Sequence, residues 1–373
     1  MVEWLAKDEE ERATTEFDGQ KRYAVEKYYF DHYVQHFTTG TYSQALSLIP
    51  SVNSWDDHDI LDGYGSYPPK YQLCDVMQAH EPMVSVLPPP ASTSSSSSTP
   101  TVRPPARLRT LVVLPDTRSE RTKEMILSNE TYKLLDEQIR SNLLPTTKHL
   151  VIVLGTPLVY PALTLFEDSL EALGDTLSRQ GIVGKIFGKC KAFENVLGQF
   201  GPELLDDLVD SWACNVHTEE KKKFVELLQS ISSQRGVRTT FVGGDVHVGG
   251  AGRLFGTNST DRLRDPYHMT QIVSSAIVNG PPPGAVISAL HKSAKTYPLN
   301  DYTSEEMTEI FNQDVTGEDL EHKMLLNRRN WCEVRELSGL ELEFTIRVEN
   351  EDHSGTRKYP ILVDRLEVAA REY

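Results

Sequence analysis

The sequence predicts an α/β fold, because short apolar segments typical of buried strands alternate with longer segments of helical periodicity. We expect strands at Arg107–Pro115, Lys148–Gly155 and Val237–Val242, and helices at Glu130–Leu143 and Glu219–Gln234. The composition, with 39% hydrophobic and 25% charged residues, is that of a globular protein. A chain of 373 residues can form one large domain or two.

The N-terminal segment, residues 4–37, is predicted to be helical. Charged residues dominate its beginning, and apolar residues then recur at helical spacing, which predicts a face directed toward the core. Gly40 should end this element, and Tyr42–Leu48 should form a short helix or strand. The core-facing residues are expected to be Tyr23, Val25, Tyr28, Tyr29, Tyr33 and Phe37.

The segment from Trp55 to Pro68 has an unusual density of acidic side chains, followed by turn residues. Carboxylates packed together repel one another, and a hard divalent cation compensates them naturally, since carboxylate oxygen and imidazole nitrogen both bind such ions. A solvated acidic loop is the alternative. The ionisable residues are Asp56, Asp57, His58, Asp59 and Asp62.

A second polar segment follows the predicted strand Val237–Val242 and contains Asp245 and His247 between pairs of glycines. Open α/β sheets place their ligand sites at the carboxyl ends of strands, and glycines let the backbone approach a phosphate or metal closely. An ordinary tight turn would explain this segment taken alone. Combined with the acidic segment, it suggests one site assembled from distant parts of the chain.

The strand at Arg107–Pro115 leads into Asp116, Arg118 and Arg121. An arginine can hold phosphate oxygens with two parallel hydrogen bonds and stays charged. The alternative is local pairing among Asp116, Arg118, Glu120 and Arg121.

The segment Pro88–Pro105 is rich in proline, serine and threonine and is predicted to be a disordered insertion, because it cannot bury apolar area. Since motif residues lie on both sides of it, we assign residues 1–335 to one domain. The remaining residues, 336–373, are predicted to be a C-terminal β-hairpin extension packed on the same domain, formed by Glu341–Val348 and Tyr359–Val368.

Between these parts, Trp212 is interpreted as a packing residue and His217 as a surface residue. Further elements are expected as a helix at Leu204–Trp212, a strand at Gln271–Val278 and a helix at Thr303–Gln313.

The net charge of −16 argues against nucleic acid as a partner. No run of about 18 apolar residues is present, so no membrane span is expected. The N-terminus lacks the apolar stretch of a signal peptide, which makes a cytoplasmic location the default expectation. The four cysteines form no Cys-x-x-Cys pair and predict neither a zinc knuckle nor a disulfide framework.

Three motifs together resemble PhoD-like phosphatases of the binuclear metallophosphoesterase class, with uncharacterised fungal proteins closest. They are Trp55–Asp59, Asp116–Arg121 and Gly244–His247, and they occur in the family's order. The resemblance covers roughly residues 20–335. Supporting stretches are Gly155–Pro161, Leu204–Trp212 and Ser274–Asn279.

The resemblance implies a sandwich of two mixed sheets flanked by helices, with metals at strand ends. Family members carry a strand followed by Gly-Asp upstream of the acidic motif, and the 54 residues before Trp55 contain no such strand. We therefore expect the chain to correspond to the later part of a longer family member and to lack the first strands, which would leave one sheet with an open edge.

The resemblance also implies a role for each site residue. Divalent metal ions (Ca, Fe, Mn or Zn) would be bound by Asp57, Asp245 and His247, and His58 would act as general acid. Asp56, Asp59 and Asp62 would orient the metal ligands. Arg118 and Arg121 would bind phosphate.

The implied activity is hydrolysis of phosphate monoesters or diesters by metal-activated water. A phosphate-ester small molecule or a phospholipid headgroup would be the substrate. Two alternatives remain open. One is a catalytically weak family member that binds a metal or a phosphorylated ligand, and the other is a metal-dependent nuclease, which the acidic charge disfavours.

Overall fold

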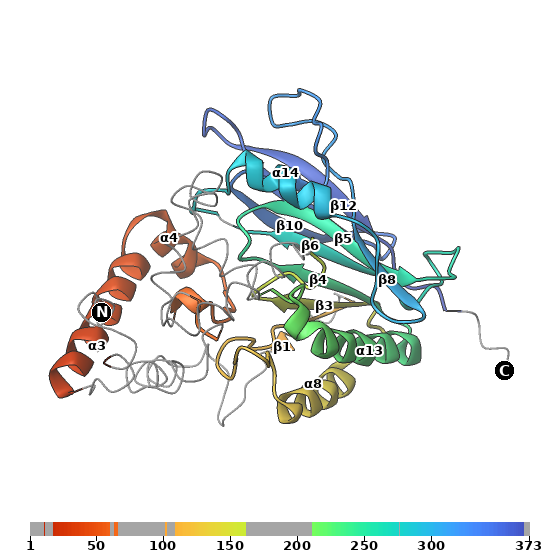
Figure 1. Ribbon diagram of the computed structural model, residues 1–373, viewed down its shortest axis with the longest axis horizontal. Coiled ribbons are helices and arrows are strands. Elements are labelled where there is room, and N and C mark those ends of the chain that lie inside the picture. The colour runs from red at the N-terminus through yellow and green to blue at the C-terminus, as the bar shows by residue number, and fades with distance from the viewer. Residues whose placement is uncertain are drawn as a thin grey trace.

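Two β-sheets lie face to face, and helices cover the outer side of the larger one (Figure 1). The computed structural model describes residue 11 and residues 18–59, 63–65, 101–102, 109–161, 211–275 and 277–368. The described helices are α3 (Gly19–Thr38), α4 (Gly40–Leu48), η1 (Asp57–Asp59), α8 (Asn129–Asn142), η3 (Asn215–His217), α13 (Thr218–Arg235) and α14 (Gly284–Ser293). The described strands are β1 (Thr101–Val102), β2 (Thr110–Val113), β3 (His149–Leu154), β4 (Arg238–Gly243), β5 (Gly249–Gly256), β6 (Met269–Ser274), β7 (Tyr297–Pro298), β8 (Thr303–Met307), β9 (Leu325–Leu326), β10 (Asn330–Glu336), β11 (Leu342–Glu349) and β12 (Thr356–Val363).

The larger sheet is mixed and has the strand order β1-β2-β3-β4-β6-β5-β8-β7, with β9 paired to β5. Neighbours from β2 to β6 are parallel, and β5 pairs antiparallel with β6, β8 and β9. The α/β class predicted from the sequence is therefore confirmed. The strands predicted at Arg107–Pro115, Lys148–Gly155 and Val237–Val242 correspond to β2, β3 and β4.

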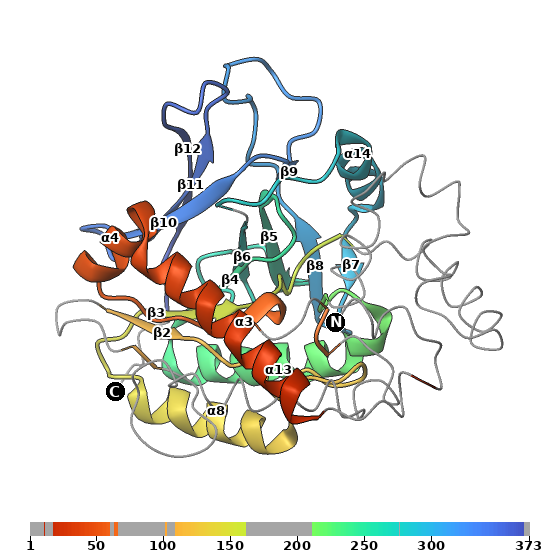
Figure 2. The same cartoon turned by 90° about the vertical axis from the view of Figure 1, so that its left-hand side faces the viewer.

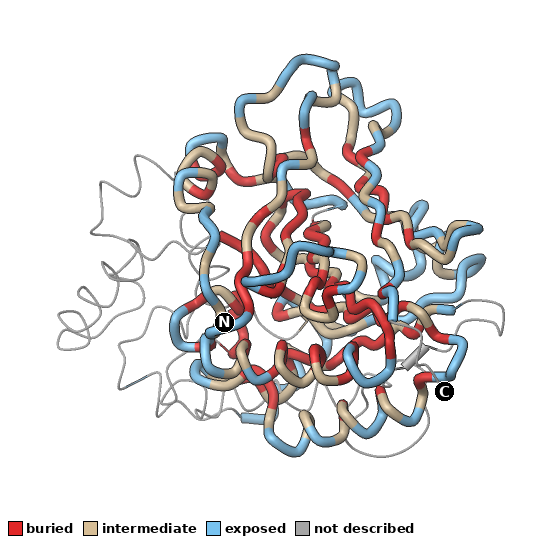
Figure 3. The backbone as a smooth tube through the Cα atoms, turned by 90° about the vertical axis from the view of Figure 1, so that its right-hand side faces the viewer, coloured by how far each residue is buried: buried red, intermediate tan, exposed pale blue. Residues whose placement is uncertain are grey.

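Alternate residues of the central strands belong to two separate cores. Leu150 of β3 packs in a cluster with Ile139 of α8 and Phe224 of α13. The next residue, Val151, packs in the second cluster with Phe344 of the small sheet. Figure 3 shows the buried residues concentrated in the strands between these layers. The near-continuous apolar runs of these strands reflect burial on both faces.

The two helices predicted beside the large sheet are confirmed as α8 and α13, which lie on the same side of it (Figures 1 and 2). At the start of α8, the side chain of Ser128 accepts a hydrogen bond from the backbone N–H of Thr131 at 3.2 Å, which caps the helix. At the end of α13, Gly236 has a φ of 65°, a left-handed conformation that glycine adopts without a Cβ penalty.

The small sheet consists of β10, β11 and β12, all antiparallel. β11 and β12 pair antiparallel, with Leu342 opposite Val363 and Glu349 opposite Thr356. Its third strand, β10, begins at Asn330, just before the boundary expected between residues 335 and 336. The Asn330 side chain donates to the carbonyl of Ser275 at 2.7 Å, so the small sheet is joined to the end of β6.

The expectation that the aromatic residues of the N-terminal helix face the core is wrong. α3 contains no buried residue, and Tyr23 and Tyr28 are 67% and 64% exposed. The helix packs against α4 and lies beside the sandwich rather than within it (Figure 1). Its rings contact one another, as in the pair of Tyr33 and Phe37, whose centroids are 5.2 Å apart. The helical spacing marks these mutual contacts and not a core-facing stripe.

Two further expectations are wrong because the partners come from distant parts of the chain. The helix predicted at Thr303–Gln313 is absent: residues 303–307 form β8, in which Glu305 pairs with buried Lys221 of α13 at 2.6 Å, and residues 308–313 form no helix. His217, expected on the surface, is buried. Burial, with the positive charge of Arg121, lowers the pKa of His217 to about 3. Trp212 is fully buried and stacks on Phe224, as a packing residue should.

Several expectations concern residues outside the described ranges, namely most of the helix at 204–212 and of the insertion at 88–105. Within that insertion, β1 pairs with Val112 and Val113 of β2, so the outer edge of β2 is paired in part rather than open. Among the described helices, none combines the length and apolarity needed to cross a membrane.

Candidate functional site

The loops that follow β2, β3 and β4 meet at one edge of the large sheet, because these strands are parallel neighbours. The backbone N–H of Gly244 donates to the carbonyl of Gly155 at 3.0 Å, which joins two of the loops. A side chain at Gly243 would place its Cβ 2.8 Å from Cα of Pro157. Glycine at 243 therefore allows the close backbone approach that the sequence predicted at this position.

The acidic segment reaches this edge through the short helix η1. Asp57 is buried, and its Oδ2 accepts the backbone N–H of Gly63 at 2.7 Å. Asp59 accepts the backbone N–H of Asp56 at 3.0 Å and the hydroxyl of Tyr33 from α3. These bonds fix the turn and aim Asp56 and Asp57 at the loops of the sheet.

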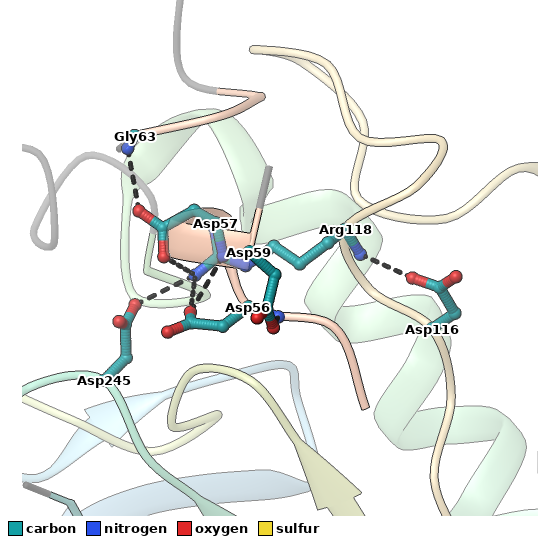
Figure 4. A network of polar contacts seen from close by, with 7 residues as sticks. All are labelled: Asp56, Asp57, Asp59, Gly63, Asp116, Arg118 and Asp245. Carbon is teal, nitrogen blue, oxygen red and sulfur yellow. Dashed lines mark hydrogen bonds and ion pairs between the residues drawn. The ribbon is translucent and has the colours of Figure 1, made fainter. Parts of the chain in front are cut away.

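Three carboxylates gather around one guanidinium at this edge (Figure 4). Asp56, Asp57 and Asp245 each offer an oxygen atom, and these atoms lie within 4.8 Å of one another. Arg118 Nη2 lies 3.0 Å from Asp245 Oδ2, 3.5 Å from Asp57 Oδ1 and 3.7 Å from Asp56 Oδ1. We call Asp56, Asp57 and Asp245 the carboxylate cluster.

The cluster perturbs the acidity of two of its members. Burial opposes ionisation of Asp57, but its hydrogen bond with Asp56 and the charge of Arg118 hold the pKa of Asp57 below its ordinary value. Burial, the same hydrogen bond and the negative charge of Asp245 raise the pKa of Asp56. The pair therefore carries its first negative charge far more readily than its second.

The backbone is strained where β4 ends. Asp245 and His247 have φ values of 73° and 52°, in the left-handed region that non-glycine residues rarely adopt. Such residues cost on the order of 1–3 kcal/mol each and collect at functional sites. The His247 backbone N–H donates to Ser275 Oγ at 3.1 Å, and its ring Nδ1 donates to the carbonyl of Gly280 at 3.1 Å. Since Nδ1 carries the proton, Nε2 is left as an acceptor.

Comparison with known families identifies the chain. The family model for PhoD-related phosphatases matches residues 1–83, 107–181 and 174–369, which is most of the sequence. The chain belongs to the PhoD-related phosphatase family.

Individual relatives and solved structures are similar to the chain over much of its length. An uncharacterised protein of Saccharomyces cerevisiae, YGR266W, is 26% identical over 412 residues, which cover 90% of this chain and 57% of that protein. The solved structure of PhoD matches with a TM-score of 0.50 and 14% identity, covering 88% of this chain and 58% of that chain. The purple acid phosphatase PPD1 from yellow lupin (Lupinus luteus) seeds matches with a TM-score of 0.41 and 10% identity, over 85% and 41%. The chain thus spans a little over half the length of YGR266W and PhoD.

The structure brings together some predicted site residues of this PhoD-related chain and separates others. Asp57, Asp245 and Arg118 meet in the carboxylate cluster with Asp56, but His58 lies on the exposed side of η1. Within the described ranges, neither His58 nor His247 supplies an atom to the three-carboxylate group. Asp62 lies outside the described ranges.

The two predicted phosphate ligands have different surroundings. The alternative of local pairing is wrong for the side chain of Arg118, which turns to the cluster while Asp116 accepts the Arg118 backbone N–H at 3.0 Å. Arg121 is buried, and a Cβ at Gly65 would stand 2.6 Å from its Cγ. Gly65, with a φ of 98°, therefore lets the turn of the acidic segment lie against Arg121.

Sequence reasoning missed Tyr33 and Asn330, which position the PhoD-related motifs from outside them. Tyr33 donates to Asp59, as described above. Asn330 Oδ1 accepts the backbone N–H of Ser275 at 3.1 Å, and the hydroxyl of Ser275 accepts the His247 N–H. No motif in the sequence marks either residue, because each acts through a partner brought close by folding.

The carboxylate cluster fits one hard divalent cation. Carboxylate oxygens are the ligands such ions prefer. Asp57 Oδ1 is buried and has no hydrogen-bond partner, so it retains the capacity to ligate. The His247 ring, whose Nδ1 is fixed by the carbonyl of Gly280, has the arrangement common to metal-binding histidines.

Proposed function

We propose that this PhoD-related chain hydrolyses phosphate esters at a divalent-cation site formed by Asp57 and Asp245, with Asp56 beside them and His247 as a further ligand. The observation that carries the proposal is the convergence of carboxylate oxygens from two distant motifs within 4.8 Å. A folded protein gathers like charges in this way at a cost, which a bound cation removes.

A bound cation would supply Lewis-acid activation of a phosphoryl oxygen and of the attacking water. The protein's own residues supply the rest. His58, exposed on η1 next to Asp57, donates a proton to the leaving oxygen. Asp59 holds η1 in place through its bonds to Tyr33 and to the backbone of Asp56. Arg118 and Arg121 are the proposed phosphate ligands.

The proposed substrate is a phosphate ester of a small molecule or a phospholipid headgroup. The net charge of −16 disfavours a nucleic acid backbone. A weakly active protein that mainly binds a metal or a phosphorylated ligand is the second candidate. It is favoured by the single three-carboxylate group found among the described residues, since in-line displacement is stabilised best by two cations.

The test combines metal analysis with hydrolysis of p-nitrophenyl phosphate and bis(p-nitrophenyl) phosphate by the purified chain. We expect about one bound metal per chain and weak turnover. Asp57→Asn should abolish both, whereas His58→Ala should keep the metal and lower turnover about 10²–10⁴-fold.

The matched control is Asp352→Asn, which changes the same chemical group in the exposed turn between β11 and β12 and should alter neither quantity. Metal binding without hydrolysis of either ester would favour the second candidate. A chain that binds no metal would overturn the proposed hydrolysis at a cation site and would leave only binding of a phosphorylated ligand.

A further inference from the structure

The guanidinium of Arg118 stands where a metal ion would bind. The side chain is fully buried, and Nη2 contacts an oxygen of each member of the carboxylate cluster. A divalent cation needs oxygen contacts of about 2.0–2.6 Å. Each carboxylate offers an oxygen within 4.8 Å of the other two, and Nη2 lies 3.0 to 3.7 Å from one oxygen of each, so a cation bound by all three would compete with the guanidinium for the same carboxylates.

We propose that Arg118 is a built-in cation that fills the metal position while the cluster is metal-free, and that a metal ion must displace its guanidinium to bind. The inference rests on the proposed function only in that the cluster binds a divalent cation. Its new content is competition between this residue and the metal.

The contacts of Arg118 are suited to exchange. Of the three contacts between Nη2 and the carboxylate cluster, the one with Asp245, at 3.0 Å, is a hydrogen bond, and those with Asp57 and Asp56 are ion pairs at 3.5 and 3.7 Å. Asp57 Oδ1 accepts no hydrogen bond, although it is buried. The guanidinium neutralises the cluster without satisfying all its oxygens, and a metal at shorter range would bind them better.

The start of the Arg118 side chain is held by hydrogen bonds to its own backbone segment. Asp116 accepts the backbone N–H groups of Arg118 and Ser119, both at 3.0 Å, which holds the start of the side chain in place. The backbone is thus fixed, while the ion pairs at the tip can exchange.

The contrary view makes Arg118 a positioning residue that holds the carboxylates ready for the metal. The two views predict opposite changes in metal affinity when Arg118 is removed. If Arg118 competes, its removal tightens metal binding, because the cation no longer has to displace a like charge. If Arg118 positions the carboxylates, its removal weakens metal binding.

The experiment is calorimetric titration of the metal-free chain with Mn²⁺ and Ca²⁺, comparing wild type, Arg118→Met and Arg118→Lys. Methionine keeps much of the apolar length of the side chain without its charge. We expect Arg118→Met to bind about tenfold more tightly or better (about 1.4 kcal/mol). Arg118→Lys keeps a charge on a single nitrogen and should fall between the two proteins.

Thermal unfolding with and without metal supplies a second readout. Metal-free Arg118→Met should melt lower than wild type, and the increase in Tm on adding metal should be larger. Arg264→Met, which removes an exposed charge of the same sign, controls for the change in net charge and should bind metal like wild type.

The outcomes separate this inference from the proposed function. Equal or weaker metal binding by Arg118→Met, with binding by wild type intact, overturns the competition alone. Absence of binding in every protein overturns both. If Arg118→Met does not fold, Arg118→Lys still decides, since equal or weaker binding than wild type contradicts competition.

Discussion

Two buried arginines, Arg118 and Arg238, show how the same side chain serves a site and a structural joint. The guanidinium of Arg238 donates five hydrogen bonds, all to backbone carbonyls, at 2.6 to 3.3 Å. That of Arg118 faces three carboxylates, only one of them at hydrogen-bond distance. The acceptors of Arg238 are neutral, belong to the fixed backbone and match all five of its donors, so this arginine acts as a structural joint. The acceptors of Arg118 are charged and only partly hydrogen-bonded, so a second cation can compete for them.

The position of Arg238 explains its structural task. It begins β4, and its acceptors belong to residues 262–268 and to Asp364 near the described C-terminal end. One side chain thereby ties a surface loop and the segment after β12 to the central strand. Burial lowers the pKa of Arg238 to about 10, so it stays protonated at neutral pH.

The largest effect should follow from breaking the structural joint. Arg238→Met leaves five carbonyls without their donor in a buried setting, and we expect a loss of about 3–5 kcal/mol in the free energy of unfolding. Chemical denaturation measures it. Arg264→Met is the control and should change stability by less than about 0.5 kcal/mol.

Metal addition sharpens the contrast between the two arginines. It should raise the Tm of Arg238→Met by no more than it raises that of wild type, since the joint contains no cation site. If metal instead raises the Tm of Arg238→Met as much as that of Arg118→Met, the two arginines do not differ in the way proposed, with Arg238 structural and Arg118 at a cation site.

The second largest effect should be a loss of stability in acid near the Arg238 joint. Burial first, and then the charges of Arg238 and Arg262, lower the pKa of His268 to about 3. The unfolded chain, with an ordinary histidine pKa of about 6.5, binds more protons between these values, so stability falls as pH drops from about 6.5 toward 3. The contribution of His268 should approach about 1.4 kcal/mol per pH unit within that window.

Denaturation of wild type and His268→Gln at pH 7, 6, 5 and 4 checks this. The difference in stability between the two proteins should shift in favour of the variant as pH falls. Parallel pH profiles would show that His268 is not protonated on unfolding in this range. His217, whose pKa is also about 3, contributes the same slope to both proteins and cancels in the comparison.

The same contrast explains what the sequence could predict. The strands before Asp116 and Asp245 were found from their apolar runs, and parallel strands that end at one edge bring the loops after them together. The meeting of Asp57 with Asp245 was inferred from the residue types of the two motifs, because Asp57 lies on η1 and follows no strand of this sheet. The joint of Arg238 could not be found, because its acceptors are backbone carbonyls that carry no signature in the sequence. Residues 303–307 form a strand by pairing with β5 and β7, and Glu305 in that strand bonds to Lys221, which is 84 residues away in the sequence.

The candidate site was predicted by residue type better than by contact. Asp57, Asp245 and Arg118 were singled out from three separate motifs and lie together in the structure, yet Arg118 was expected to bind phosphate and its contacts with these carboxylates were not predicted. A sequence motif indicates which chemical groups lie in a site. Which of those groups contact one another depends on differences in distance of a few tenths of an ångström, which the motif does not indicate. For the N-terminal helix, the sequence predicted the helix correctly but predicted a buried face, whereas α3 contains no buried residue.

The smallest expected effect tests whether that exposed helix belongs to the site. Tyr33 joins α3 to the acidic segment by donating its hydroxyl to Asp59, whose other oxygen holds the backbone of Asp56. Burial and the charge of Asp59 raise the pKa of Tyr33, so it remains a donor at neutral pH. Tyr33→Phe should therefore lower metal affinity severalfold, below the roughly 10–100-fold loss seen when a direct partner of a metal ligand is removed. It should lower stability by about 0.5–1.5 kcal/mol.

Tyr28→Phe, in the same helix but 64% exposed, is the matched control and should change neither quantity. Metal titration of both variants measures the difference. Equal affinities would mean that α3 lies beside the site without supporting it, whereas a loss confined to Tyr33→Phe would extend the site to a part of the chain that contributes nothing to the core.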